Sequence, residues 1–290
     1  MKTILVLGSS GQVGAYLVVE LKLQGYEVLE FDIARDEAED LRTPNNQLLE
    51  TLIKKSDYVF FLAFDVGGSG YLEQYQNSIE FISSNARIME NTFRILHKFD
   101  KCFVFASSQM SNMTHSTYGV LKLLGEKYVK SIPNGRTVHF WNVYGFENDV
   151  QKFHVISDFA IMAKFNGQIK MRTTGTEERD FLYAVDCCQA LIRIMQMHDN
   201  IKPNALLHLT SFKSTKILEV ARIIAAHYGS TVLPGTKVDT VQLDARNKAE
   251  PYILEFWSPK TDISVGISEV LNRIDRECLS PDKYKSILER

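Results

Sequence analysis

An apolar segment that runs straight into a glycine-rich turn and a helix constrains this chain more than any other feature. Residues 2–7 are mostly apolar and lead into Gly8, and Gly11 and Gly14 follow at three-residue intervals. Apolar residues at 13, 17 and 21 then recur at the spacing of one helix face. A strand, tight turn and helix in this order let the backbone and the helix N-terminus approach a dinucleotide pyrophosphate.

A carboxylate follows the next apolar segment. Residues 27–31 form a second predicted strand, which leads directly into Asp32. At this position a carboxylate accepts hydrogen bonds from the hydroxyls of an adenosine ribose. It would repel a 2′-phosphate, so we expect NAD rather than NADP as the cofactor, with nearby Arg35 as the argument for NADP.

Tyr118 and Lys122 are the strongest candidates for chemistry. Four residues separate them, so a helix places both on one face. A lysine ammonium and an oxidised nicotinamide near the phenol would lower its pKa and make it a base. The same spacing also occurs by chance on ordinary helices, so the pair is informative because a dinucleotide turn precedes it.

Composition argues against several functional classes. The 290 residues carry a net charge of −2 with a pI near 6.4, which gives no basic field for nucleic acid or anionic membranes. The chain opens without a cleavable apolar leader, and its longest apolar run, residues 58–64, is too short to cross a bilayer. We therefore expect a cytoplasmic protein. The four cysteines lack C-x-x-C spacing, which predicts reduced thiols and no metal site.

Strand and helix patterns alternate through the first half of the chain and become less regular after Gly145. Strands are expected at residues 57–63, 102–106 and 137–141, and a flexible substrate loop is expected at residues 67–70. One long helix is expected over residues 73–97. It carries two apolar stripes, Ile79, Ile82, Ala86, Met89, Phe93 and Leu96 on one side and Phe81, Ile88 and Ile95 on the other. Two apolar faces need two partners, so we expect a sheet under one stripe and a homodimer interface over the other.

Five motifs together resemble the extended short-chain dehydrogenase/reductases, and specifically the NAD-dependent nucleotide-sugar epimerase/dehydratase family. They are Gly8-x-x-Gly11-x-x-Gly14, Ser107-Ser108, Tyr118-x-x-x-Lys122, Asn142-Val143-Tyr144-Gly145 and Arg179-Asp180-Phe181-x-Tyr183. The resemblance implies an α/β fold with a Rossmann-type doubly wound parallel sheet and a smaller, discontinuous C-terminal substrate domain. The NAD-binding domain would comprise residues 1–145 and about 180–210. The domain that binds a nucleoside diphosphate sugar would comprise about 146–179 and 211–290.

The resemblance also implies roles for individual residues. The catalytic set would be Ser108, Tyr118 and Lys122. The cofactor set would add Gly8, Gly11, Gln12, Val13, Gly14, Asp32, Asp40, Leu41, Leu62 and Ala63. The substrate set would comprise Gly68, Ser108, Asn142, Arg179 and Arg246, in which the arginines suit a diphosphate.

Departures from the family pattern narrow the chemistry. Sugar 4,6-dehydratases of this family carry an Asp-Glu pair directly after the active-site serine or threonine, where this chain has Gln109 and Met110. The reactive cysteine of the similar GDP-sugar 3,5-epimerases is absent from the same place. Only nine residues separate Ser108 from Tyr118, which shortens the active-site cover, and His115 in this loop is a candidate auxiliary acid/base.

Three functions remain open from the sequence. The first is a nucleotide-sugar epimerase acting at C4 through transient hydride transfer to NAD. The second is a one-way NAD(P)-dependent reductase or dehydrogenase of a nucleotide keto-sugar, which would use the same residues. The third is an NAD-sensing binding protein without chemistry, although such proteins usually lose the tyrosine or the lysine. The motifs identify neither the nucleotide base nor the sugar.

Overall fold

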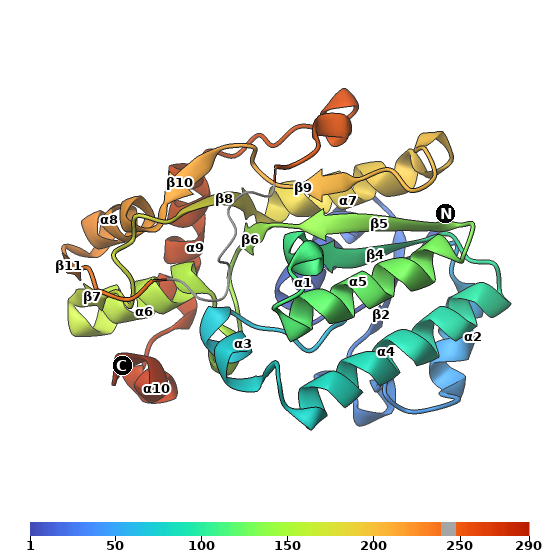
Figure 1. Cartoon of the computed structure of the whole chain (residues 1–290), viewed down its shortest axis with the longest axis horizontal. Helices are drawn as coiled ribbons and strands as arrows, with labels where there is room; N and C mark the ends of the chain where they lie inside the picture. Colours follow the sequence, from blue (N-terminus) through green and yellow to red (C-terminus); the bar gives the residue numbers. More distant parts are fainter. Residues whose placement is uncertain (239–247, 290) are drawn as a thin grey trace.

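A six-stranded parallel sheet forms the centre of the molecule (Figure 1), as expected for a Rossmann-type α/β fold. The computed structural model describes residues 1–238 and 248–289. The strand order is β2-β1-β3-β4-β5-β9. The strands are β1 (Thr3–Leu7), β2 (Glu27–Phe31), β3 (Tyr58–Phe61), β4 (Phe103–Ser108), β5 (Gly135–Phe140) and β9 (Leu207–Leu209). The chain leaves β1 toward β2 and returns to β3 on the other side of β1. This reversal creates a switch point, and ligands of such sheets bind there, beyond the carboxyl ends of the strands.

Helices cover both faces of the sheet, which explains why its inner strands are apolar at nearly every position. In β1, Ile4 and Val6 pack with α1 (Gln12–Leu23) and α7 (Ala184–Gln196) on one face. Leu5 and Leu7 pack on the opposite face, in the core that α2 (Gln47–Lys55), α4 (Ile79–Lys98) and α5 (Thr117–Lys130) complete.

Smaller sheets and a separate apolar core lie beside the main sheet, at the left of Figure 1. Strands β6 (Asn142–Tyr144), β8 (Glu178–Tyr183) and β10 (Ser214–Lys216) form one sheet, and β7 (Gln168–Lys170) pairs with β11 (Thr231–Leu233). The helices of this part are α6 (Val155–Asn166), α8 (Ile217–Tyr228), α9 (Ile263–Glu277) and α10 (Lys285–Leu288). We propose that this core defines the substrate domain. Because Ile253 packs with the core of the main sheet, we further propose that residues 251–257 belong to the NAD-binding domain.

The helix expected over residues 73–97 is two helices, α3 (Ser69–Tyr75) and α4. The hydroxyl of Ser78 caps α4 by accepting a hydrogen bond from the Phe81 amide at 3.2 Å, so α4 begins afresh there. Phe81 and Ile88 are buried in the core of the main sheet, whereas Ile79 is 69% exposed. The prediction of an interface through Ile88 is therefore wrong. On α4 the exposed large apolar side chain is that of Ile79, at the N-terminal end of the helix.

The helices and the cysteines narrow the possibilities for membrane insertion and for thiol chemistry. Across residues 1–238 and 248–289, no helix combines the length and apolarity needed to cross a membrane. Cys102, Cys187, Cys188 and Cys278 are free thiols. Burial raises the pKa of both Cys187 and Cys188, so these two thiols stay protonated and inert at physiological pH.

Candidate active site

A cleft of about 1260 Å³ lies at the carboxyl ends of the central strands and extends to the smaller sheets. It brings together all three residues expected to be catalytic and every residue expected to contact NAD. Of the substrate set, Gly68, Ser108, Asn142 and Arg179 also line the cleft. Arg246 lies outside the described residues. His115 is exposed and is not among the residues that line the cleft, so the structure does not bring it to the site.

The glycine turn between β1 and α1 has the close backbone contacts that its sequence requires. Gly8 has a φ of +87°, and a Cβ at Gly14 would lie 1.9 Å from the carbonyl oxygen of Gly8. Side chains at these two positions would therefore distort the turn. Helix α1 begins at Gln12 with its N-terminus beside the cleft and has no acidic residue in its first turn. These features suit the binding of an anionic pyrophosphate.

Asp32 is held at the end of β2 by backbone hydrogen bonds. One carboxylate oxygen accepts the Ser10 amide and the other accepts the Ala34 amide, both at 2.9 Å. Each oxygen keeps a second lone pair for a ribose hydroxyl. The guanidinium of Arg35 binds the carboxylates of Glu30 and Glu39, which removes the main argument for NADP.

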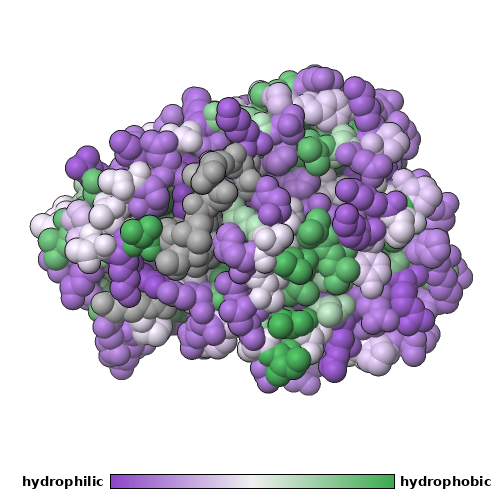
Figure 2. Space-filling view, viewed as in Figure 1, coloured by the Kyte–Doolittle hydropathy of each residue, from purple (hydrophilic) through white to green (hydrophobic). Residues whose placement is uncertain are grey.

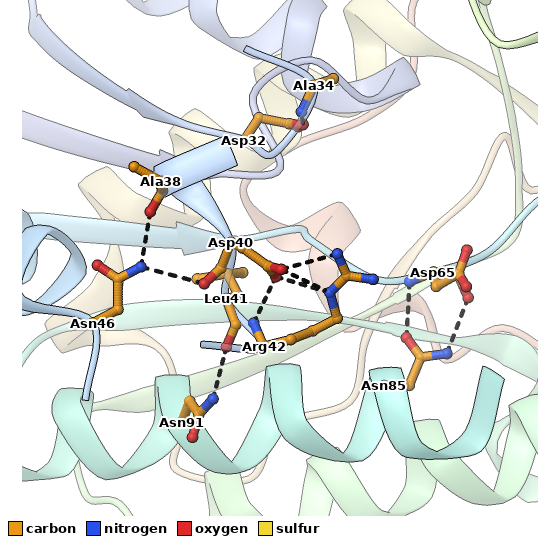
Figure 3. A network of polar contacts seen from close by, with 10 residues as sticks. All are labelled: Asp32, Ala34, Ala38, Asp40, Leu41, Arg42, Asn46, Asp65, Asn85 and Asn91. Atoms are coloured by element: carbon orange, nitrogen blue, oxygen red, sulfur yellow. Dashed lines mark hydrogen bonds and ion pairs between the residues drawn. The ribbon is translucent and has the colours of Figure 1, made fainter. Parts of the chain in front are cut away.

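A polar network holds the segment after β2 against α4 (Figure 3). The side chain of Asn46 donates to the carbonyl of Asp40 at 3.3 Å, and that of Asn91 donates to the carbonyl of Leu41 at 2.9 Å. Partial burial opposes ionisation of Asp40, but hydrogen bonds from Arg42 outweigh it and lower the pKa of the carboxyl. Asp40 and Leu41 are thus fixed where they line the cleft.

Tyr118 lies in the first turn of α5, a helix whose start is fixed by Ser116. The Ser116 hydroxyl accepts the Gly119 amide at 3.2 Å, and the amide of Tyr118 donates to the side chain of Gln76 at 3.3 Å. Tyr118 is 8% exposed, and Ser108 at the end of β4 is near enough to its phenol to lower the pKa of the phenol. The structure therefore brings the expected serine and tyrosine together in the cleft.

Lys122 is buried one helical turn beyond Tyr118. Its ammonium donates to the carbonyl oxygen of Ala106 at 2.7 Å and lies 3.7 Å from the centroid of the Phe64 ring. The distance from the ammonium to the Tyr118 ring centroid is 5.7 Å. Lysine and tyrosine share a helix face, as their spacing predicts.

The protonation of this pair differs from the expectation that lysine makes the phenol acidic. Burial raises the pKa of Tyr118 to about 12, and the hydrogen bond from Ser108 lowers it only in part. Burial also lowers the pKa of Lys122 to about 7, although Glu126 acts in the opposite direction. Desolvation dominates both groups, and the spacing of residues in a sequence does not reveal it.

Gly68 proves to be a packing position rather than part of an open loop. Its amide donates to the Lys152 carbonyl at 3.1 Å, and a Cβ there would lie 2.2 Å from the carbonyl oxygen of Phe153. Among the other substrate-set residues, Asn142 has a buried side-chain nitrogen without a hydrogen-bond partner. Such an amide can donate to a substrate oxygen.

Sequence reasoning missed a carboxylate–histidine pair in the cleft. Glu147 Oε1 lies 2.6 Å from His154 Nδ1, and the other carboxylate oxygen accepts hydrogen bonds from the His154 amide and the Ser157 hydroxyl. Burial lowers the pKa of His154, but the neighbouring Glu147 outweighs it and the net shift is upward. Both residues line the cleft, so His154 is a second candidate acid. The sequence carried little signal of it, because Glu147 and His154 are seven residues apart and His154 directly precedes α6, which begins at Val155.

Comparison with known protein families identifies the kind of site. The model of the NAD dependent epimerase/dehydratase family matches residues 4–208. The chain belongs to this family. It is therefore an NAD-dependent enzyme, as the sequence motifs predict, and the alternative of a non-catalytic NAD sensor is set aside.

Relatives within the epimerase/dehydratase family catalyse several reactions. A GDP-L-fucose synthase of Sinorhizobium fredii (strain NBRC 101917 / NGR234) is 23% identical over 303 residues, covering 92% of this chain and 94% of its own. A UDP-glucose 4-epimerase of Thermotoga maritima, solved with UDP-glucose, has a TM-score of 0.76 at 16% identity and covers 96% and 100% of the two chains. A GDP-6-OMe-4-keto-L-xylo-heptose reductase from C. jejuni has a TM-score of 0.79 at 17% identity and covers 96% and 98%. The structural similarity confirms the fold. The two solved structures are an epimerase and a reductase by name.

The residues present fit the NAD that the epimerase/dehydratase family uses. The turn from Gly8 to Gly14 lines the cleft, and the hydroxyl of Ser9 within it is buried without a hydrogen-bond partner. Asp32 offers acceptors for the ribose, and Tyr118 and Lys122 line the far end of the same cleft. Gly8, Gly14, Asp32, Tyr118 and Lys122 thus line one cleft of about 1260 Å³.

We expect NAD to bind more tightly than NADP by about tenfold or more, because a 2′-phosphate charge about 4–6 Å from Asp32 is repelled by about 1.4–2 kcal/mol at an effective dielectric constant of about 40. Asp32→Asn should reduce this preference, whereas Asp36→Asn, at an exposed position of the same loop, should leave it unchanged. Titration of each variant with both cofactors at physiological ionic strength measures the ratio. Equal affinities of the unaltered protein for NAD and NADP would show that Asp32 has been misassigned.

Proposed function

We propose that this chain is a nucleotide-sugar epimerase that acts at C4 of the sugar through transient hydride transfer to NAD. The observation that carries the proposal is the contact between Ser108 and Tyr118 beside buried Lys122, within the cleft that holds the glycine turn. These groups suffice for hydride transfer coupled to transfer of one proton. Support also comes from Gln109, which cannot ionise, and from Met110, which is buried and has no proton to donate.

Each residue has a distinct part in this reaction. Tyr118 takes the proton of the sugar hydroxyl as the hydride leaves carbon and returns the proton after the ketosugar has turned its other face. Ser108 donates a hydrogen bond to the phenol oxygen and stabilises negative charge there. Lys122 supplies a nearby positive charge. Bound NAD supplies the hydride acceptor of the first step, the hydride donor of the second and a positive charge that favours the phenolate.

The nucleoside diphosphate would lie across the smaller sheets. Arg179 on β8 offers a guanidinium suited to a diphosphate, and Asn142 on β6 offers the side-chain amide described above. Strands β6 and β8 are paired, and Asn142 is opposite Phe181 in the register, so the two polar residues lie close together in the sheet. The proposed substrate is therefore bound on one domain while its sugar reaches the serine and tyrosine on the other.

A reductase of a nucleotide keto-sugar is the second candidate, and the Glu147–His154 pair favours it. Epimerisation at C4 needs only the proton that Tyr118 carries. A second acid in the cleft has no task in that reaction, but it has one in a reductase that first exchanges a proton at the carbon next to the ketone and then reduces the ketone. The two candidates share the same cofactor site and the same Tyr118 chemistry.

Product analysis tests the proposal. The enzyme is incubated with NAD and a panel of UDP-, GDP-, dTDP- and CDP-hexoses, and the mass and stereochemistry of the products are followed. An isomeric product without net NADH supports the epimerase, and stoichiometric formation of NADH with a keto-sugar, the reverse of keto-sugar reduction, supports the reductase or dehydrogenase. A product lighter by one water, formed at a catalytic rate, would contradict both.

We also propose that the enzyme is a homodimer formed through α4 and α5. Figure 2 shows apolar residues gathered over α5 and the start of α4. Ile79, Val120 and Leu124 are 69%, 46% and 43% exposed there. A cluster of exposed aliphatic side chains on neighbouring helices is the usual composition of a subunit interface.

Leu124→Asp should convert the dimer to a monomer, because the interface would have to bury an unpaired carboxylate. Val19→Asp is the matched control, since Val19 is 55% exposed on α1, on the opposite face of the sheet. Light scattering on a sizing column gives the mass of each protein. If the unaltered protein already has the 33.1 kDa mass of one chain, α4 and α5 do not form an interface.

A further inference from the structure

A buried carboxylate lies one helical turn beyond Lys122, outside the residues that line the cleft. Glu126 on α5 is 8% exposed, accepts a hydrogen bond from the Ser107 hydroxyl at 2.6 Å and lies 3.1 Å from Nε2 of His139. Burying an ionised carboxylate is costly unless partners satisfy it. Burial indeed raises the pKa of Glu126, but hydrogen bonds from His139, Ser107 and Ser111 outweigh this effect and bring the pKa down to about 2. Glu126 is therefore a negative charge at every physiological pH.

The surroundings of Lys122 give this charge a role. The nearest groups to the ammonium, the carbonyl of Ala106 and the ring of Phe64, carry no net charge. The titratable groups on the same side of α5 are Tyr118, one turn before Lys122, and Glu126, one turn after it, and His139 on β5 contacts Glu126. Of these, Glu126 is the one that raises the pKa of Lys122, against a burial effect that lowers it to about 7. The ammonium form of Lys122 thus depends on a group that never touches the substrate.

Two histidines pack beside Glu126. His139 and His208 are opposite each other on paired strands, with ring centroids 4.8 Å apart and the rings 17° from parallel. Burial, together with His139, lowers the pKa of His208 to about 4, so His208 is neutral at physiological pH. Trp141 donates to Nδ1 of His208 at 2.9 Å and fixes this ring. These contacts hold the carboxylate of Glu126 in place on α5.

We infer that Glu126 is a positioning residue of the active site: its carboxylate holds the Ser107 end of β4 against α5 and supplies the negative charge that keeps Lys122 an ammonium. The same anchor holds the adjacent Ser108 at the end of β4, beside Tyr118. The inference builds on the role of Lys122 in the proposed function. Its test needs no turnover, so its failure and that of the proposed function can be told apart.

The test is a direct titration of Lys122 by NMR in protein labelled with ¹³C at lysine Cε. The Lys122 signal is assigned by its loss in Lys122→Met. In Glu126→Gln, which keeps the side-chain shape and removes the charge, the pKa of Lys122 should fall by about one unit, a tenfold shift in its protonation equilibrium. An unchanged pKa in a folded Glu126→Gln protein would overturn the inference.

Asp186→Asn is the matched control. Asp186 is another buried carboxylate, 2% exposed, and it accepts the backbone amides of Lys260 and Thr261. Its replacement should lower thermal stability and leave the titration of Lys122 where it was. A shift of equal size in Asp186→Asn would mean that loosening of the fold, and not the charge of Glu126, moves the lysine, and this also would overturn the inference.

A measurement on the unaltered protein covers the case in which Glu126→Gln does not fold. With ¹³C at glutamate Cδ, the Glu126 signal should keep the chemical shift of an ionised carboxylate throughout the range in which Lys122 titrates. A Glu126 carboxyl found protonated near neutral pH could not hold the lysine charged, and the inference would fall.

Discussion

Tyr118→Phe lowers turnover by about 10²-fold or more and leaves NAD affinity and folding intact. The size is that of losing a positioned acid/base, and the phenyl ring can keep the edge-to-face contact that Tyr118 makes with Phe64. Turnover on an accepted nucleotide sugar and a calorimetric NAD titration measure the two effects separately.

Tyr128→Phe is the control for this change. Tyr128 is on the same helix but stacks on Phe93 and does not line the cleft, so its hydroxyl should be dispensable for turnover. If Tyr118→Phe keeps most of its activity, another group moves the proton. His154 would then be the first residue to examine, because it lines the cleft and the exposed His115 does not.

Lys122→Met should abolish most activity and at the same time stabilise the folded protein. Burial lowers the pKa of Lys122 to about 7 from an ordinary value of 10.5, so the charged lysine destabilises the native state. The gain in unfolding free energy should be on the order of 2–4 kcal/mol near neutral pH. Active sites commonly hold such groups at the expense of stability.

The pH dependence of this gain has a definite sign. Between the folded and unfolded pKa values the unfolded chain binds more protons, so the stability of the unaltered protein rises with pH there. The advantage of Lys122→Met should therefore be full below about pH 7 and disappear as pH approaches 10.5. Denaturant unfolding at several pH values measures it, with Lys127→Met at an exposed position of α5 as the control. An advantage that is constant with pH would show that Lys122 does not titrate as described.

The fold could be predicted from local signals because its strands are buried on both sides. Residues 2–7 and 57–63 are nearly continuous apolar runs, and such runs fit the interior of a parallel sheet. The dinucleotide turn could be predicted for a related reason: Gly8 and Gly14 contact each other across six residues, so the whole constraint lies in a short segment. Tyr118 and Lys122 share a helix face for the same local reason.

Features that depend on tertiary packing could not be predicted in this way. The direction in which Ile88 points is set by the sheet beneath α4. The sequence alone does not tell which of the two apolar stripes faces that sheet. His154 joins Glu147 because the chain turns back between β6 and α6. The raised pKa of Tyr118 follows from its burial under Phe64 and Ser108, which involves three segments of the chain.

The fate of the hydrogen at C4 tests the central claim most directly. The enzyme is given unlabelled NAD and nucleotide hexoses that carry deuterium at C4, and the products are examined by mass spectrometry and NMR. If the hydride leaves and returns on the same bound cofactor, the product is the C4 epimer and keeps its deuterium at C4. A C4 epimer that has lost its deuterium to solvent, or a product whose C4 configuration is unchanged, would contradict an epimerase that acts at C4 by transient hydride transfer.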